Sequence, residues 1–246
     1  MKSQPYERVI YDKNPLIEVI CQVRFPTVLR IANQGAFEFQ EKIQSDYPFC
    51  QKLESSSNNI CNFIFRSENS KWQVSLTENT LALSTLEYEK YEDFREKFVD
   101  LTKLLETTYT IPFYVRVGLR YRDLILRSEL NIQDEPWLEL IDESLILELK
   151  NPYLSDKIES INKSIEIKID SSAKLRFNHG IVTAQDPEQM KEEEEAYLLD
   201  YDFYVEGKVS KNEVFNRIDQ FKEEAGTRFR YSITQKLHDA MSPRPI

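Results

Sequence analysis

Apolar and polar residues alternate near the start of the chain, in the segment 15–25. Every second position in it is apolar: Ile17, Val19, Cys21, Val23 and Phe25. A period of two residues is typical of a β-strand with one buried face. Pro15 and Pro26 bracket the segment, as expected of residues that cannot donate a hydrogen bond within a sheet.

The rest of the first half shows both kinds of period. Short alternating segments predict strands at 60–66, 71–77 and 80–86. Apolar residues spaced three and four apart predict helices at 34–47 and 90–108. The first half therefore has the order β-α-β-β-β-α.

The second half repeats this order of elements. We predict a strand at 113–127, a helix at about 136–149, strands at 163–170, 173–178 and 197–206, and a helix at about 211–240. An acidic insertion at 183–196 interrupts the series. Ser210 and Glu213 have the spacing of a capping box, which marks the start of the last helix.

These patterns predict an α+β fold with one large, curved, antiparallel sheet of about eight strands and helices on one face. If the halves 1–112 and 113–246 are pseudo-repeats within one continuous domain, the fold is similar to the saddle of TATA-binding proteins. The alternative is a helix-grip arrangement, in which a curved sheet wraps the last helix. Both architectures leave one face of the sheet open.

The composition narrows the classes of partner. The chain has 32 basic and 42 acidic residues, a net charge of −10. Residues 1–130 carry 17 basic and 18 acidic side chains, which leaves 15 and 24 for residues 131–246. Nucleic acid and anionic lipid are repelled at long range by such a charge, although a local basic face could still bind an anion. The run from Glu192 to Glu195 is expected to form a solvated loop.

We expect a cytoplasmic protein without a membrane partner, because no uncharged run is long enough to span a bilayer and no signal peptide is recognisable. The cysteines Cys21, Cys50 and Cys61 lack C-x-x-C spacing, which argues against a disulfide framework or a zinc site.

Three segments resemble a known family. They are Asn14–Pro26 (NPLIEVICQVRFP), Arg116–Tyr121 (RVGLRY) and Leu199–Tyr204 (LDYDFY), followed by the helix with Phe229, Ile233 and Thr234. Together they resemble a sporadically distributed family of functionally uncharacterised bacterial and archaeal proteins. The resemblance covers nearly the whole chain and implies no catalytic residues. The patchy distribution implies genes that travel horizontally, and hence an accessory component of a mobile-element or antiviral-defence system.

Two sets of charged residues could carry chemistry. Asp200, Asp202 and Glu206 share one face of a predicted strand, where carboxylates could hold a divalent cation for hydrolysis. Arg116, Arg120 and Arg122 share the outward face of another strand and could bind phosphate or carboxylate. We favour a third interpretation, in which these arginines pair with the carboxylates of a neighbouring strand.

Other catalytic signals are weak. The five glycines are scattered, so no phosphate-binding loop is recognisable. His179 is expected in a loop, and His238 as a cation near a helix C-terminus. Neither histidine has a partner motif, and we expect no cofactor. Trp137, Tyr153, Tyr204 and Tyr231 are expected to be exposed, as aromatic residues at interfaces often are before binding.

Three hypotheses for function remain. The first is a non-catalytic protein-binding or regulatory module, whose partner would be basic if the acidic half binds it; a homo-oligomer stays open. The second is a metal-dependent hydrolase or nuclease that uses Asp200, Asp202 and Glu206. The third is nucleic-acid or anion binding by Arg116, Arg120 and Arg122. We favour the first, because no strong catalytic motif is present.

Overall fold

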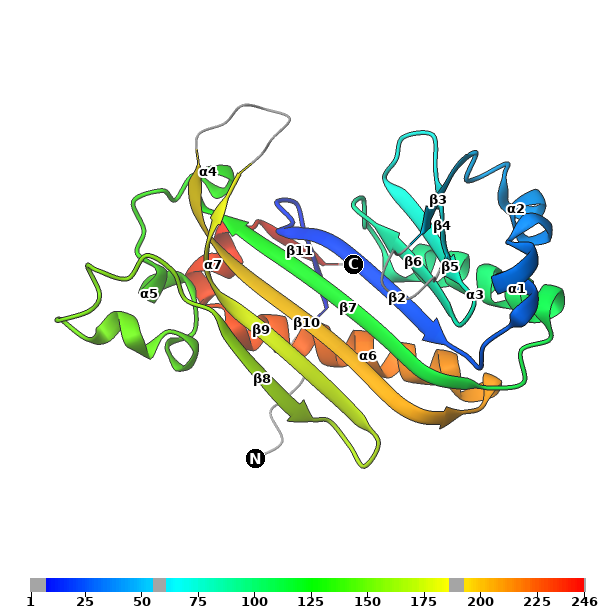
Figure 1. The fold of residues 1–246 in the computed structure, drawn as a ribbon. Helices are drawn as coiled ribbons and strands as arrows, with labels where there is room; N and C mark the ends of the chain where they lie inside the picture. Colours follow the sequence, from blue (N-terminus) through cyan, green and yellow to red (C-terminus); the bar gives the residue numbers. More distant parts are fainter. Residues whose placement is uncertain (1–7, 55–60, 186–192, 246) are drawn as a thin grey trace.

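The alternating segments of both halves join into one antiparallel sheet of nine strands (Figure 1). The computed structural model describes residues 8–54, 61–185 and 193–245. In order across the sheet, the strands are β3 (Phe49–Glu54), β4 (Cys61–Arg66), β5 (Trp72–Thr77), β6 (Thr80–Thr85), β2 (Leu16–Arg24), β7 (Tyr114–Leu126), β10 (Glu194–Val209), β9 (Ala173–Ala184) and β8 (Lys163–Lys168).

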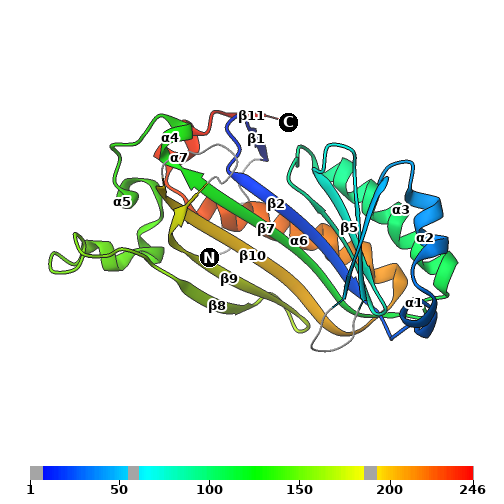
Figure 2. The same ribbon diagram turned by 45° about the horizontal axis from the view of Figure 1, so that its top comes forward.

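Two long helices, α3 (Tyr91–Tyr109) and α6 (Lys211–Ser232), pack on the same side of this sheet. Figures 1 and 2 show α6 running along the back of β7 and β10. A separate two-stranded sheet pairs β1 (Val9–Tyr11) with β11 (Pro243–Pro245). The shorter helices are α1 (Leu29–Gln34), α2 (Phe37–Ile43), α4 (Arg127–Leu130), α5 (Trp137–Leu140), η1 (Glu143–Leu145), η2 (Leu147–Lys150) and α7 (Gln235–Ala240).

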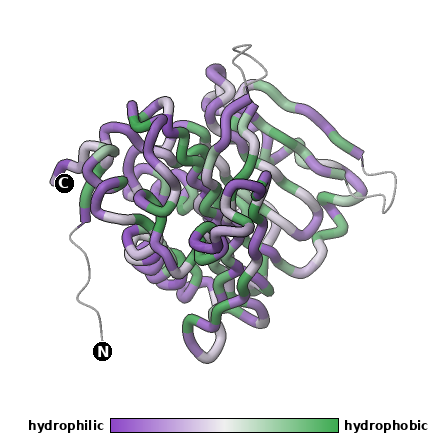
Figure 3. The backbone as a smooth tube through the Cα atoms, turned by 90° about the vertical axis from the view of Figure 1, so that its left-hand side faces the viewer, coloured by the Kyte–Doolittle hydropathy of each residue, from purple (hydrophilic) through white to green (hydrophobic). Residues whose placement is uncertain are grey.

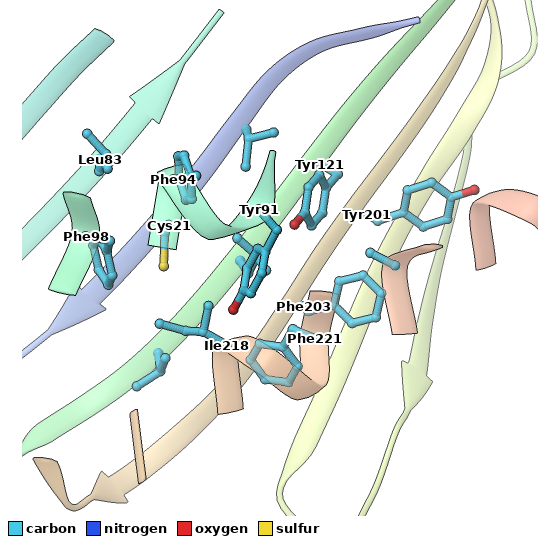
Figure 4. Close-up of a cluster of buried hydrophobic side chains, with 14 of the residues drawn as sticks. Cys21, Leu83, Tyr91, Phe94, Phe98, Tyr121, Tyr201, Phe203, Ile218 and Phe221 are labelled. Atoms are coloured by element: carbon cyan, nitrogen blue, oxygen red, sulfur yellow. The ribbon is translucent and has the colours of Figure 1, made fainter. Parts of the chain in front are cut away.

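The core lies between the sheet and the two long helices. Hydrophobic and hydrophilic residues alternate along the strands, as the colours in Figure 3 show. Because successive side chains of a strand point to opposite faces, the hydrophobic set points toward the helices. Phe221 of α6 stacks on Phe203 of β10 with ring centroids 5.8 Å apart, and Phe94 of α3 stacks on Trp72 of β5 at 5.9 Å. Figure 4 shows the cluster that these helices bury against the strands.

The predicted fold class is confirmed: the chain is α+β, with one large curved antiparallel sheet and helices. The first half supplies the block β2 to β6 and the second supplies β7 to β10, and the two blocks meet where β2 pairs with β7. The saddle built of two equal repeats is not confirmed, since the blocks differ by one strand. Among the described residues, no helix is both long and apolar enough to cross a membrane.

Two differences from the predicted elements lie in the first half. Only α2 lies within the helix expected at 34–47, and the preceding helix α1 is not predicted by the pattern; Gly35, with a positive φ of 84°, separates the two. Strand β3 is not predicted by the pattern. It is an edge strand exposed at every position, so no buried face imposes alternation on its sequence.

Tertiary contacts also break two helices predicted in the second half. The helix expected at 136–149 is α5 followed by two short 3-10 turns, η1 and η2. The helix expected at 211–240 ends at Ser232, and α7 begins at Gln235. Ile233, between them, is extended and forms an isolated β-bridge with Ile141. This bridge pulls both segments out of helical geometry at the same place.

Candidate functional site

The sheet face opposite α6 carries the charged residues singled out in the sequence. The register places Glu18 of β2 beside Arg122 of β7, and Arg122 beside Asp200 of β10. Because alternate residues of a strand share a face, the other predicted residues lie on it too: Arg116, Arg120, Asp202 and Glu206. We call this surface the open sheet face. In Figure 1, no helix of the described chain crosses in front of it.

The predicted pairing of arginines with carboxylates is confirmed, and it runs diagonally. Arg120 stands directly opposite Asp202, yet its Nε and Nη2 atoms donate to Asp200 at 2.7 and 2.6 Å. Arg116 in turn reaches Asp202, with Nη2 3.3 Å from both carboxylate oxygens. Arg120 therefore binds a carboxylate two residues from its register partner, within reach of a long side chain. Arg116 extends along the sheet to a carboxylate four residues from its own register partner, Glu206.

Asp200 is the most deeply buried member of this network. Only 3% of the residue is exposed, and the side-chain amide of Asn178 donates to it at 3.4 Å in addition to Arg120. The hydrogen bonds from Arg120 are bidentate, and they raise the pKa of that guanidinium. A buried carboxylate needs such partners, because its desolvation is otherwise uncompensated.

Tyr204 links the charge pairs of β7 to β9 and β8. Its ring lies under two guanidinium groups, with the Cζ of Arg116 at 5.0 Å and that of Arg176 at 5.8 Å from the ring centroid. Its hydroxyl donates to Glu166 at 2.9 Å, and Lys174 also binds Glu166, at 2.7 Å. Tyr204 is buried, contrary to the prediction, because charged side chains cover it.

Gly118 explains how the Arg116 side chain lies flat on this face. A Cβ atom at position 118 would stand 2.7 Å from Nη1 of Arg116 and 3.3 Å from the carbonyl oxygen of Phe203. Any larger residue would displace the guanidinium from Tyr204 and Asp202. The glycine of the segment RVGLRY thus leaves room for the side chain of Arg116, two positions earlier in the same strand.

The three carboxylates proposed as metal ligands lie on one face, and two of them are engaged with arginine. Asp200 and Asp202 accept the hydrogen bonds from Arg120 and Arg116, while Glu206 is exposed opposite Arg116. Within the residues that the structure describes, no group of three His, Cys, Asp or Glu side chains is placed to hold a metal ion. The metal-binding hypothesis stays a prediction that this geometry does not favour.

Both histidines lie in environments that differ from those predicted. His179 lies in β9 rather than a loop. It is 2% exposed, its Nδ1 is 2.9 Å from the hydroxyl of Tyr197, and burial lowers its pKa to about 4. His238 lies in α7, where its ring nitrogen is 2.7 Å from the hydroxyl of Tyr11. Burial lowers its pKa as well, which opposes the cation predicted there.

Part of the acidic run is structural. Glu194 and Glu195 begin β10, so the expected solvated loop is wrong for them; Glu192 lies outside the described residues. Glu195 accepts from Arg127 at 2.9 Å and from the indole of Trp137 at 2.7 Å. Trp137 is therefore buried rather than exposed. Of the aromatic residues predicted to be exposed, Tyr153 and Tyr231 are so.

Two residues of interest were missed by sequence reasoning. Arg176 follows the same alternation as the predicted arginines, but only the strand order shows that β9 lies next to β10. Asp123 alternates with the arginines of β7 and therefore faces the core side, where it is 6% exposed. An acidic residue at an inward position of an apolar strand is a signal that the alternation alone could have given.

Comparison with protein-family models gives no matching family, and comparison with curated proteins gives no match. The family resemblance of the three segments, and the genomic context that it implies, therefore stay predictions.

Proposed function

We propose that the chain is a non-catalytic binding module that recognises another protein through the open sheet face. The observation that carries this proposal is the network of ion pairs across β2, β7, β10, β9 and β8, together with the two guanidinium groups that lie over the ring of Tyr204. Arginine and tyrosine are the side chains that often dominate the energy of protein interfaces. Here they are held in place by neighbours before any partner binds, which lowers the entropic cost of association.

The pairing favours a protein over a polyanion as the partner. Arg116, Arg120 and Arg122 each have a carboxylate oxygen within 3.3 Å, so their charges are compensated inside the network. Nucleic-acid binding depends instead on basic groups that can release counterions from phosphates. The net charge of −10 adds long-range repulsion of such a partner.

Two exposed arginines remain to select the partner. Arg24 donates to Gln22 at 3.2 Å, and Arg176 stacks on Tyr204. In the described ranges, neither guanidinium has a carboxylate within ion-pair distance. A partner that presents carboxylates near these two positions would complete the network. The basic partner inferred from the acidic half of the chain stays a prediction about other surfaces.

The test uses the full chain as bait in an extract of its native host, followed by calorimetry with the purified partner. Arg24→Glu and Arg176→Glu should each weaken binding about tenfold or more, since charge reversal places like charges together. The control is Lys103→Glu on α3, where the lysine side chain is 70% exposed and lies away from the open sheet face. The control should bind as the wild type does.

Three results would contradict the proposal. Equal binding by the wild type and both arginine variants would place the interface elsewhere. Recovery of nucleic acid, with binding that weakens steeply as salt rises, would favour the third hypothesis. Tight Mg²⁺ or Mn²⁺ binding that is lost in Asp202→Ala would favour a metal-dependent enzyme.

A further inference from the structure

A cavity of about 240 Å³ lies on the helix side of the sheet, apart from the open sheet face. It is bounded by β1, by the first turn of α3, by the C-terminal half of α6 and by the sheet. Aromatic rings form much of its wall: Tyr11, Tyr88, Tyr121, Tyr201 and Phe229. Figure 4 shows Tyr121 and Tyr201 on the strands that form the floor of this region.

Asp123 of β7 also lines the cavity and is its one deeply buried carboxyl group among the described residues. Within the part of the chain that the structure describes, the side chain of Asp123 has no hydrogen-bond partner and no ion pair. Burial raises its pKa to about 8, and the charge of Asp200 across the strand adds to this effect. The register between β2 and β7 shifts beside Asp123, between Leu16 and Glu18. Such irregularities often re-aim side chains at functional sites.

The charged groups around the cavity already have partners of their own. Arg8 is 2.9 Å from Glu92, and Lys222 is 2.7 Å from Glu223. Arg230 donates to a main-chain carbonyl three residues along its own chain. The remaining charged wall residues, Glu89 and Lys90, are exposed at the rim before α3. Among residues 8–54, 61–185 and 193–245, no cation therefore forms an ion pair with the buried carboxyl group.

We propose that this cavity binds a small organic amine, with the ammonium group donating to Asp123 and the hydrocarbon body lying against the tyrosine rings. Aromatic faces attract cations through their quadrupole, and a carboxylate accepts the N–H bonds of an ammonium. The volume lies below the range of about 300–1,000 Å³ that holds drug-sized ligands, so the ligand is compact. This inference is independent of the proposed protein partner.

The raised pKa distinguishes an amine from a neutral ligand. At neutral pH the empty cavity holds Asp123 mainly in its protonated form. An ammonium ion binds the carboxylate, so amine binding releases a proton from Asp123 to solvent. The affinity should therefore rise with pH between about 6 and 8, while the amine itself stays protonated. An alcohol of the same shape binds with no such proton release.

The experiment compares n-butylamine and 2-phenylethylamine with 2-phenylethanol by titration calorimetry on the full chain. Runs in two buffers with different ionisation heats count the released protons. We expect both amines to bind with release of up to one proton, the alcohol to bind at least tenfold more weakly, and Asp123→Asn to lose the amine preference. Thermal unfolding of Asp123→Asn checks that the variant is folded. Glu224→Gln is the matched control: Glu224 lies on α6, which forms part of the wall, but outside the cavity, and this variant should bind like the wild type.

The proposal is overturned if the alcohol binds as tightly as the amines, if folded Asp123→Asn keeps the wild-type affinity for them, or if neither amine binds at millimolar concentration. A failure of this kind leaves the protein-binding proposal intact, because that proposal depends on the opposite face of the sheet.

Discussion

Replacing Asp123 with asparagine tests the electrostatics of the core most directly. The side chains have nearly the same shape, so the substitution removes the titrating proton and leaves the packing in place. Asp123 is 6% exposed, and burial raises its pKa to about 8. An unfolded chain has an aspartate pKa of about 3.9. Between these two values, the folded chain holds a proton that the unfolded chain has released.

The size and sign of the effect follow from linkage. Because the folded state binds the extra proton, the free energy of unfolding falls as pH rises, by about 1.4 kcal/mol per pH unit between the two pKa values. The cumulative loss is about 4 kcal/mol by pH 7. Total domain stability is typically about 5–15 kcal/mol, so the loss is readily measurable. Asp123→Asn should remove this slope and gain stability relative to the wild type as pH rises.

The assay is urea unfolding followed by circular dichroism at several pH values from mildly acidic to mildly alkaline. The slope is the measurement that matters, since a buried amide without a partner carries its own cost of about 1–3 kcal/mol. That cost is independent of pH and shifts the whole curve of the variant. If the wild type and Asp123→Asn show parallel dependence on pH, the carboxyl group is not held protonated by burial, and the reasoning fails.

Three further predictions concern the stability of the chain. Phe221→Ala should lower the free energy of unfolding by about 3–5 kcal/mol, because Phe221 is fully buried. Phe229→Ala should lower it by less, since Phe229 is only partly buried. Glu224→Ala should change it by no more than about 0.5 kcal/mol. Urea midpoints that rank these variants otherwise would contradict the docking of α6. Gly226→Ala should stabilise the helix by about 1 kcal/mol, because a Cβ there meets no atom within 4 Å; a lower melting temperature would show a hidden clash. Burial lowers the pKa of His179 to about 4, so the free energy of unfolding of the wild type should fall as pH falls from about 6.5 toward 4. In acid unfolding, His179→Gln should show a smaller fall over the same pH range.

The open sheet face illustrates how far alternation can predict a site. A period of two places Arg116 and Arg120 on the same face of one strand. It likewise places Asp200 and Asp202 on the same face of a second strand. It does not show which strands are neighbours or how they are shifted. The observed diagonal pairs depend on the register between β7 and β10, which the whole sheet sets through the packing of its apolar side on α6.

The sequence by itself determined the strongly periodic elements: β2, β7 and α3 lie within one or two residues of their predicted bounds. A buried face imposes its period on the residues that form it, so these elements could be recognised locally. Only the tertiary structure decided the remainder. An exposed edge such as β3 carries no such constraint, and the bridge between Ile141 and Ile233 stops two helices whose own sequences favour continuation. The cavity around Asp123 likewise exists only because β1, α3 and α6, distant in sequence, meet over one position of β7.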